Sequence, residues 1–177
     1  MKIPGLAENA DHGSVGFEQR IHAGVFFDLV TRHVPGAALP FATPSPWTLL
    51  IEVEGCDGLD PTPALEDALA TLVGSGTVTD AVMARTPAQR DAVWRLREGI
   101  PGAQSIEGGS IKHDISVPPG QTASFLQEAG AAVQRLVPGA RVCAFGHLGD
   151  GNLHYNVSQP RGADEKSFLR NWTSVAH

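Results

Sequence analysis

Residues 145–157 read Phe-Gly-His-Leu-Gly-Asp-Gly-Asn-Leu-His-Tyr-Asn-Val, and this stretch predicts a β-hairpin. An Asp-Gly pair between two alternating segments is a strong signal for a two-residue type I′ turn, because both central positions need a positive φ. With Asp150 and Gly151 at those positions, His147 is expected to pair with His154 across the hairpin. The two imidazoles are then direct neighbours, with Cβ atoms roughly 4.5 to 5.5 Å apart.

Alternation along the two strands gives this hairpin one polar face and one apolar face. The polar face carries His147 and His154 together with Asn152 and Asn156. Two neutral imidazoles can reach one zinc or similar divalent ion at about 2.0 to 2.1 Å. The pattern therefore indicates part of a metal site, and the alternative is an ordinary hairpin with two half-exposed histidines. The apolar face is expected to consist of Val142, Ala144, Leu148, Leu153, Tyr155 and Val157.

Helices and strands alternate before the hairpin. Helix 86–98 is marked by a capping-box pattern, in which Thr86 is followed by Pro87 and Gln89. The other expected elements are helices at 17–33, at about 60–73 and at 122–136, and strands at 47–53, 77–83 and 111–117. This order predicts an α+β fold, with a largely antiparallel sheet, helices packed on one face and ferredoxin-like elements. Residues 1–15 are expected to be a linker or frayed end, which leaves 16–177 as one domain.

Composition limits the class of protein. The chain has 177 residues, of which 42% are hydrophobic, which is enough for one globular core. Its net charge is -6 with both signs interspersed, so there is no basic stripe for nucleic acid. No apolar run approaches the ~20 residues of a membrane span, and the N-terminus lacks a signal-peptide pattern, so we expect a cytoplasmic protein. Cys56 and Cys143 lack CxxC spacing and are expected to be reduced structural thiols.

Two cations and a carboxylate stand out before the hairpin. Arg97 ends a helix beside a glycine-rich break, where a guanidinium can bind a carboxylate with two hydrogen bonds; a solvated helix-end arginine is the alternative. Lys112 lies on the polar face of strand 111–117, where a solvated lysine is the alternative. Asp114 shares that face, so it can neutralise Lys112 or support a ligand histidine. His113 lies in the apolar register and is expected to be structural.

Three motifs occur in order along the chain: Arg-Glu-Gly-Ile at 97–100, Lys-His-Asp-Ile-Ser-Val-Pro at 112–118, and Gly-His-Leu-Gly-Asp-Gly-Asn-Leu-His at 146–154. Together they resemble the C-terminal substrate domain of FAD-linked D-2-hydroxyacid dehydrogenases. This family includes D-2-hydroxyglutarate dehydrogenase, D-lactate dehydrogenase and the glycolate oxidase flavoprotein subunit. The resemblance covers roughly residues 17–175.

The resemblance implies a role for five residues. Arg97 and Lys112 match residues that bind substrate carboxylates, and Asn156 matches one that contacts substrate. His147 and His154 match ligands of a divalent metal, commonly zinc. The implied reaction is oxidation of a 2-hydroxy acid to a 2-oxo acid with hydride transfer to FAD. The implied partners are that acid and an FAD-binding domain or subunit. The alternative is a non-catalytic module that binds a metal or an organic acid.

The sequence also departs from the family pattern. Family members carry an FAD-binding domain ahead of this region, and after the hairpin a Glu-His-Gly motif supplies a third metal ligand and the catalytic histidine. This chain stops at His177, so we expect a truncated domain that is inactive alone, with no catalytic residue and no assigned FAD contacts. A surface exposed by truncation permits a homo-oligomer. Pro101 replaces a substrate-contacting threonine of the hydroxyglutarate enzymes, which leaves the substrate open.

Overall fold

The structure is a computed structural model that describes residues 17–176 apart from 24, 44, 56 and 57. Residues 17–23, 25, 26 and 176 are described by their backbone only. The expected linker at 1–15 and Cys56 lie outside the described residues. The strands are β1 (Phe17–Ala23), β2 (Trp47–Val53), β3 (Ser110–Ser116), β4 (Arg141–His147) and β5 (Asn152–Ser158). The helices are α1 (Val25–His33), α2 (Thr62–Gly74), α3 (Pro87–Glu98), α4 (Ile100–Ile106), the 3-10 turn η1 (Pro119–Gln121), α5 (Thr122–Leu136), α6 (Glu165–Leu169) and α7 (Trp172–Ala176).

The five strands form one sheet in the order β2-β1-β4-β5-β3, and every neighbouring pair is antiparallel. Strands β3 and β4 both run antiparallel to β5, so they are parallel to each other, and α5 connects them. This arrangement is a split βαβ unit of the ferredoxin-like kind. The predicted α+β class and the largely antiparallel sheet are therefore confirmed.

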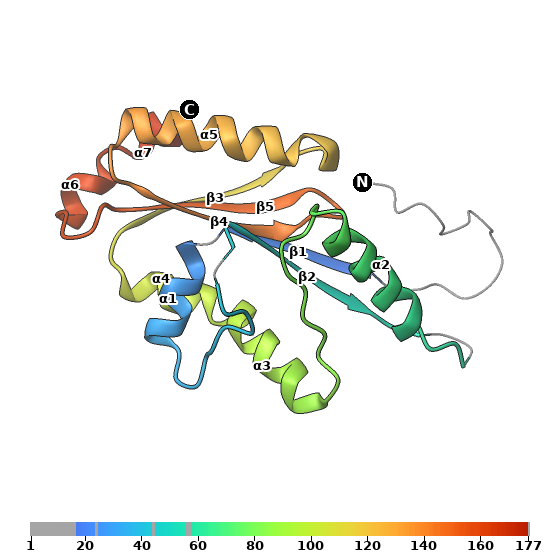
Figure 1. Cartoon of the computed structure of the whole chain (residues 1–177). Helices are drawn as coiled ribbons and strands as arrows, with labels where there is room; N and C mark the ends of the chain where they lie inside the picture. The colour runs from blue at the N-terminus through green and yellow to red at the C-terminus, as the bar shows by residue number, and fades with distance from the viewer. Residues whose placement is uncertain (1–16, 24, 44, 56–57, 177) are drawn as a thin grey trace.

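Helices lie on both sides of the sheet, with α5 and α7 above it and α1, α3 and α4 below it in Figure 1. The core is correspondingly divided in two. The lower cluster includes Leu29, Leu96, Ile100, Cys143 and Phe145. The upper cluster includes Leu126, Val133, Ala144, Leu153, Tyr155 and Val157. The sequence predicted helices on one face of the sheet only. The second helix layer is explained by β4, because successive side chains of this strand are buried and therefore both of its faces need cover.

Two local expectations were wrong. Residues 17–23 form β1 and the helix begins at Val25, because pairing with β2 and β4 outweighs a helical spacing that rests on few apolar positions. Residues 77–83 contain no strand. Instead, the chain after α2 contacts that helix: Val78 N donates to Leu72 O at 3.1 Å, and Arg85 forms an ion pair with Glu66. A strand needs a partner strand, and α2 does not supply one.

The remaining expected elements agree with the structure. The capping box of α3 is present, since Gln89 N donates to Thr86 Oγ1 at 3.3 Å and Thr86 N donates to Gln89 Oε1 at 3.1 Å. Strand β2, helices α2 and α5 and strand β3 form at the expected places. Within the described part of the chain, no helix combines the length and apolarity needed to cross a membrane.

Candidate functional site

Strands β4 and β5 are joined by a four-residue turn at 148–151 rather than by the predicted two-residue turn. His147 therefore lies opposite Asn152, and His154 lies opposite Phe145. The predicted direct pairing of the two histidines was wrong by two residues. A shift of two leaves every side chain on its predicted face. His147 and His154 remain on one face as diagonal neighbours. Residues in such diagonal positions are typically roughly 7 to 8 Å apart, a distance that long side chains can span.

The register of this hairpin is fixed by a contact that lies outside it. Val117, the residue after β3, donates its N–H to Gly151 O at 2.9 Å. Gly151 has a φ of 73°, and a Cβ atom there would lie 1.8 Å from Val117 O. A Cβ atom at Gly146 would lie 2.1 Å from Asn152 O. Gly146 and Gly151 are therefore both required by close backbone approach, which explains two of the three glycines of this stretch.

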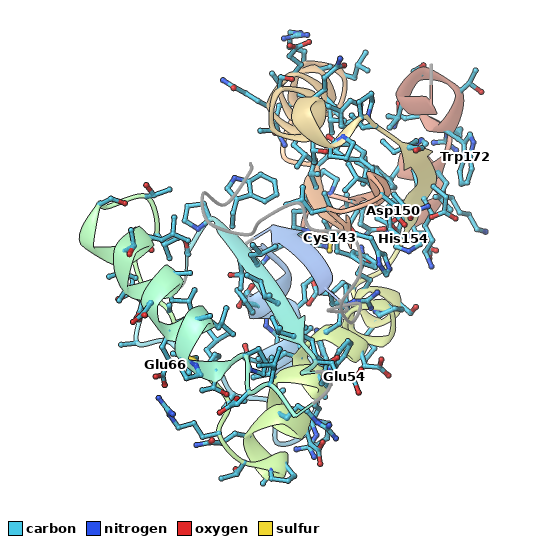
Figure 2. All side chains as sticks on the ribbon, turned by 90° about the vertical axis from the view of Figure 1, so that its right-hand side faces the viewer. Glu54, Glu66, Cys143, Asp150, His154 and Trp172 are labelled. Atoms are coloured by element: carbon cyan, nitrogen blue, oxygen red, sulfur yellow. The ribbon has the colours of Figure 1, made fainter. Side chains whose placement is uncertain are left out.

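The candidate residues of β3, β5 and β4 share one face of the sheet. Residues that are directly opposite each other in a sheet point to the same side, so the register groups them in rows. The rows across β3, β5 and β4 are Lys112-Asn156-Cys143, Asp114-His154-Phe145 and Ser116-Asn152-His147. Four of the five predicted site residues thus lie on three neighbouring strands. In Figure 2, His154 and Asp150 lie far from Glu66 of α2.

The middle row carries the most detailed contacts. Asp114 Oδ1 hydrogen-bonds His154 Nδ1, so Asp114 contacts this histidine. The Phe145 ring packs against the imidazole, with 4.9 Å between ring centroids and 39° between ring planes. The His154 side chain remains 36% exposed and that of Asp114 76% exposed. One ring nitrogen is therefore bound to a carboxylate, while the ring still reaches solvent.

Arg97 also contacts the Phe145 ring of this row. Its guanidinium Cζ lies 5.3 Å from the centroid of Phe145, a cation-π geometry. The residue is half-buried rather than fully solvated at the helix end. The chain turns from α3 into α4 at Gly99, where a Cβ atom would lie 2.7 Å from Val34 Cγ2 of the loop after α1. This close approach packs the end of α3 against α1 and the loop after it, on the side of the sheet where Arg97 contacts Phe145 of β4.

The row Lys112-Asn156-Cys143 is buried at its centre. Asn156 is 5% exposed and donates from Nδ2 to Gln104 Oε1 at 3.0 Å. Gln104 belongs to α4 and is 1% exposed. Lys112, directly opposite Asn156, is exposed, so the alternative that it is an ordinary solvated lysine stays open. Neither Gln104 nor Phe145 was found from the sequence, since a single glutamine in a short helix and one aromatic residue in a strand carry no spacing signal.

Groups on the opposite side of the sheet are separate from this site. His113 Nδ1 lies 2.9 Å from Tyr155 O, in keeping with its predicted structural position. Burial raises the pKa of Tyr155 to about 12, and the Phe125 ring meets the tyrosine edge-on at 5.5 Å. On the site face, burial raises the pKa of the Cys143 thiol to about 12, so this buried thiol is neutral. Its predicted structural role fits that environment.

A second polar group, which we name the Glu107 cluster, consists of Arg32, His33, Glu107 and Arg141. Glu107 Oε1 accepts from Arg32 Nη1 at 2.8 Å and lies 2.7 Å from His33 Nε2. Glu107 Oε2 accepts from Arg141 Nη1 at 2.5 Å. The hydrogen bond with His33, followed by that with Arg141, lowers the pKa of Glu107 to about 2. The cluster ties α1 to β4 and to the loop between α4 and β3.

Comparison with known proteins identifies the domain. Residues 18–176 match the family of FAD linked oxidases, C-terminal domain. The chain belongs to this family.

Three relatives illustrate the match. The D-2-hydroxyglutarate dehydrogenase of Arabidopsis thaliana mitochondria is 34% identical over 152 residues, which cover 83% of this chain and 27% of the relative. The enzyme of the same name from Xanthomonas citri pv. viticola is 36% identical over 85% of this chain and 32% of its own length. That from Stutzerimonas stutzeri is 37% identical over 77% of this chain and 29% of its own length. The predicted family resemblance is confirmed, and the chain spans about a third of the relatives' length.

The donor set of this FAD-linked oxidase domain fits part of a metal site. Among the described residues, no group of three or more His, Cys, Asp or Glu side chains is placed to hold a metal ion. His147 and His154 supply two imidazole nitrogens on one face, and Asp114 supports one of them. A catalytic zinc ordinarily has three protein ligands. The pair therefore fits as two ligands of a site that needs a further donor.

Proposed function

We propose that this domain forms the substrate- and metal-binding part of an FAD-dependent D-2-hydroxyacid dehydrogenase. Such an enzyme oxidises a 2-hydroxy acid to a 2-oxo acid and transfers hydride to FAD. The observation that carries the proposal is the single sheet face on which Lys112, Asn156, His154 and His147 lie, with the Arg97 guanidinium on the Phe145 ring of the same face. The names of the relatives, D-2-hydroxyglutarate dehydrogenases, support a dicarboxylic 2-hydroxy acid as substrate.

In this proposal the cations bind the carboxylates of the substrate. Arg97 is half-buried against an aromatic ring, which restricts its rotation and lowers the entropy cost of a two-point contact. Lys112 is exposed and supplies a more mobile positive charge. Asn156 donates its amide nitrogen to Gln104, so a substrate hydroxyl would meet its amide oxygen. These three residues bind and orient the acid.

We further propose that His147 and His154 hold a divalent metal, with zinc as the first candidate. When bound, such a metal lowers the pKa of a coordinated hydroxyl and fixes its orientation. Support comes from two imidazoles on one face and from the carboxylate at His154 Nδ1, an arrangement typical of metal-ligating histidines. The FAD would come from an FAD-binding domain or subunit.

For the 177-residue chain alone we propose binding without turnover, because it spans only about a third of the relatives' length. The test is a titration of zinc-containing protein with D-2-hydroxyglutarate, followed by NMR chemical shifts. D-Lactate serves as a smaller competitor. We expect saturable binding that weakens about 10- to 100-fold in Arg97→Met and in Lys112→Met, because each loses a charged hydrogen bond.

Matched controls are Arg90→Met on the same helix and Lys166→Met on α6, and both should bind as the wild type does. Equal affinity in Arg97→Met and Arg90→Met would refute the proposed substrate site. Turnover of D-2-hydroxyglutarate with an artificial electron acceptor and no added subunit would refute binding without turnover. The cytoplasmic location and the homo-oligomer remain predictions. Co-purification of the protein with an FAD-binding subunit would favour the dehydrogenase, whereas saturable binding of the acid with no such partner found would favour the non-catalytic module.

A further inference from the structure

Asp114 reaches His154 from the neighbouring strand through the register of the sheet. The two residues are direct cross-strand partners of β3 and β5, and Asp114 Oδ1 hydrogen-bonds His154 Nδ1. Asp114 is 76% exposed, so packing alone does not hold its side chain. The sequence left two partners open for this carboxylate, Lys112 and a histidine. The structure shows the contact with the histidine.

This contact bears on which imidazole nitrogen can bind a metal. A neutral imidazole carries its proton on one nitrogen and offers a lone pair on the other. A carboxylate that accepts a hydrogen bond at Nδ1 retains the proton there and leaves the lone pair on Nε2. Without that acceptor, the proton is free to move to Nε2, which then cannot ligate. The identity of the neighbour therefore decides whether His154 presents a donor to the site.

Phe145 restricts the same ring from a second direction. It lies opposite His154 on β4, and the ring centroids are 4.9 Å apart. Phe145 is itself 4% exposed and lies beneath the Arg97 guanidinium at 5.3 Å. The imidazole is thus held by a carboxylate at its Nδ1 nitrogen and by a fixed aromatic ring along its side. Its Nε2 nitrogen is the atom that remains for a metal.

We propose that Asp114 is a positioning residue that holds His154 in the Nδ1–H tautomer and thereby presents Nε2 to a divalent metal. This inference rests on the metal site of the proposed function and extends it to a residue outside the ligand set. Asp114 touches neither metal nor substrate in this account. Its effect passes through the histidine, so its removal changes the tautomer even when no metal is present.

The test combines two measurements on the 177-residue protein and its Asp114→Ala variant. Long-range 1H–15N correlation spectra of metal-free protein at about pH 9, where an ordinary imidazole is neutral, report the tautomer of each histidine. A zinc titration followed by chemical shifts then reports affinity, even when it is weak. Asp67→Ala removes an exposed carboxylate from α2 and serves as the matched control. His154→Ala separates the ligand from its support.

We expect Nδ1–H at His154 in the wild type and in Asp67→Ala, and a shift toward Nε2–H in Asp114→Ala. Zinc affinity should fall about 10- to 100-fold in Asp114→Ala, the usual cost of losing such a partner. An unchanged tautomer in Asp114→Ala would overturn the inference. A changed tautomer with wild-type zinc affinity, while His154→Ala binds weakly, would overturn the positioning role alone. Equal zinc affinity in the wild type and His154→Ala would overturn the metal site and, with it, this role.

Discussion

The molecule contains two histidine–carboxylate contacts, and they differ in almost every other respect. In the Glu107 cluster, His33 meets a carboxylate that is 11% exposed and also receives two arginines. On the β3–β5 face, His154 meets Asp114, which is 76% exposed. Glu107 is surrounded by donors that satisfy it, whereas His154 keeps an exposed ring with one nitrogen available for ligation. The same pair of residue types is therefore buried and fully partnered in one place, and is exposed in the other, where we propose a metal site.

The largest expected effect comes from breaking the Glu107 cluster. Glu107→Gln removes the charge that compensates Arg141 and Arg32, whose side chains are 13% and 38% exposed. Removing one partner of a buried ion pair costs about 3 kcal/mol or more in free energy of unfolding, and partial exposure of Arg32 lowers that figure. Urea denaturation at pH 7 measures it. A loss below about 0.5 kcal/mol would contradict a structural role for the cluster.

The same carboxylate predicts an acid-sensitive stability. The pKa of Glu107 is about 2 in the folded protein, below its ordinary value of 4.5. A lowered pKa means that the unfolded chain binds the proton more readily, so the stabilisation is present above about pH 4.5 and is lost as the pH falls toward 2. The stability difference between wild type and Glu107→Gln should therefore shrink between pH 5 and pH 3. A difference that is constant over this range would show that folding does not lower the pKa of Glu107.

A substitution in the hairpin turn is expected to lower the free energy of unfolding by a smaller amount. Gly151→Ala places a Cβ atom 1.8 Å from Val117 O at a residue whose φ is 73°. The left-handed conformation costs a non-glycine residue about 1 to 2 kcal/mol, and relief of the clash adds to it, so we expect a loss of at least about 2 kcal/mol. Gly149→Ala is the control, because nothing lies within 4 Å of its Cβ position. Equal stability of the two variants would contradict the anchored register.

The smallest effect on stability should come from the site itself. Asp114→Ala changes an exposed side chain, so the free energy of unfolding should remain within about 0.5 kcal/mol of the wild type. Thermal unfolding at pH 7 measures this, with Asp67→Ala as the reference for an exposed carboxylate. A large loss would show that Asp114 belongs with Glu107 as a structural residue, and would remove the difference between the two contacts.

Local sequence signals predicted those elements whose cause is local. The cap of α3 depends on Thr86 and Gln89, three residues apart, and it forms as expected. The positive φ of Gly151 was also predicted from the Asp-Gly pair, although the turn has four residues instead of the predicted two. The sharing of one face by His147 and His154 followed from alternation, which survives a shift of two residues.

Features that depend on distant partners could not be read from the sequence. The hairpin register depends on Val117, which lies outside the hairpin and contacts Gly151 through backbone atoms alone. The Glu107 cluster joins residues separated by 74 positions, as with His33. Strand β1 exists because β2 and β4 accept it on either side. In each case the deciding interaction carries no spacing signal.

We propose that the His147–His154 face, and not the Glu107 cluster, is the metal-binding site of this FAD-linked oxidase domain. The most direct measurement is a zinc titration of His147→Ala, His154→Ala and His33→Ala, each followed by NMR against the wild type. His33 is the matched control, because it also contacts a carboxylate and lies outside the face. We predict that zinc binding weakens at least about 10-fold in the first two variants and is unchanged in His33→Ala. Unchanged binding in His147→Ala and His154→Ala, or a loss confined to His33→Ala, would contradict the account.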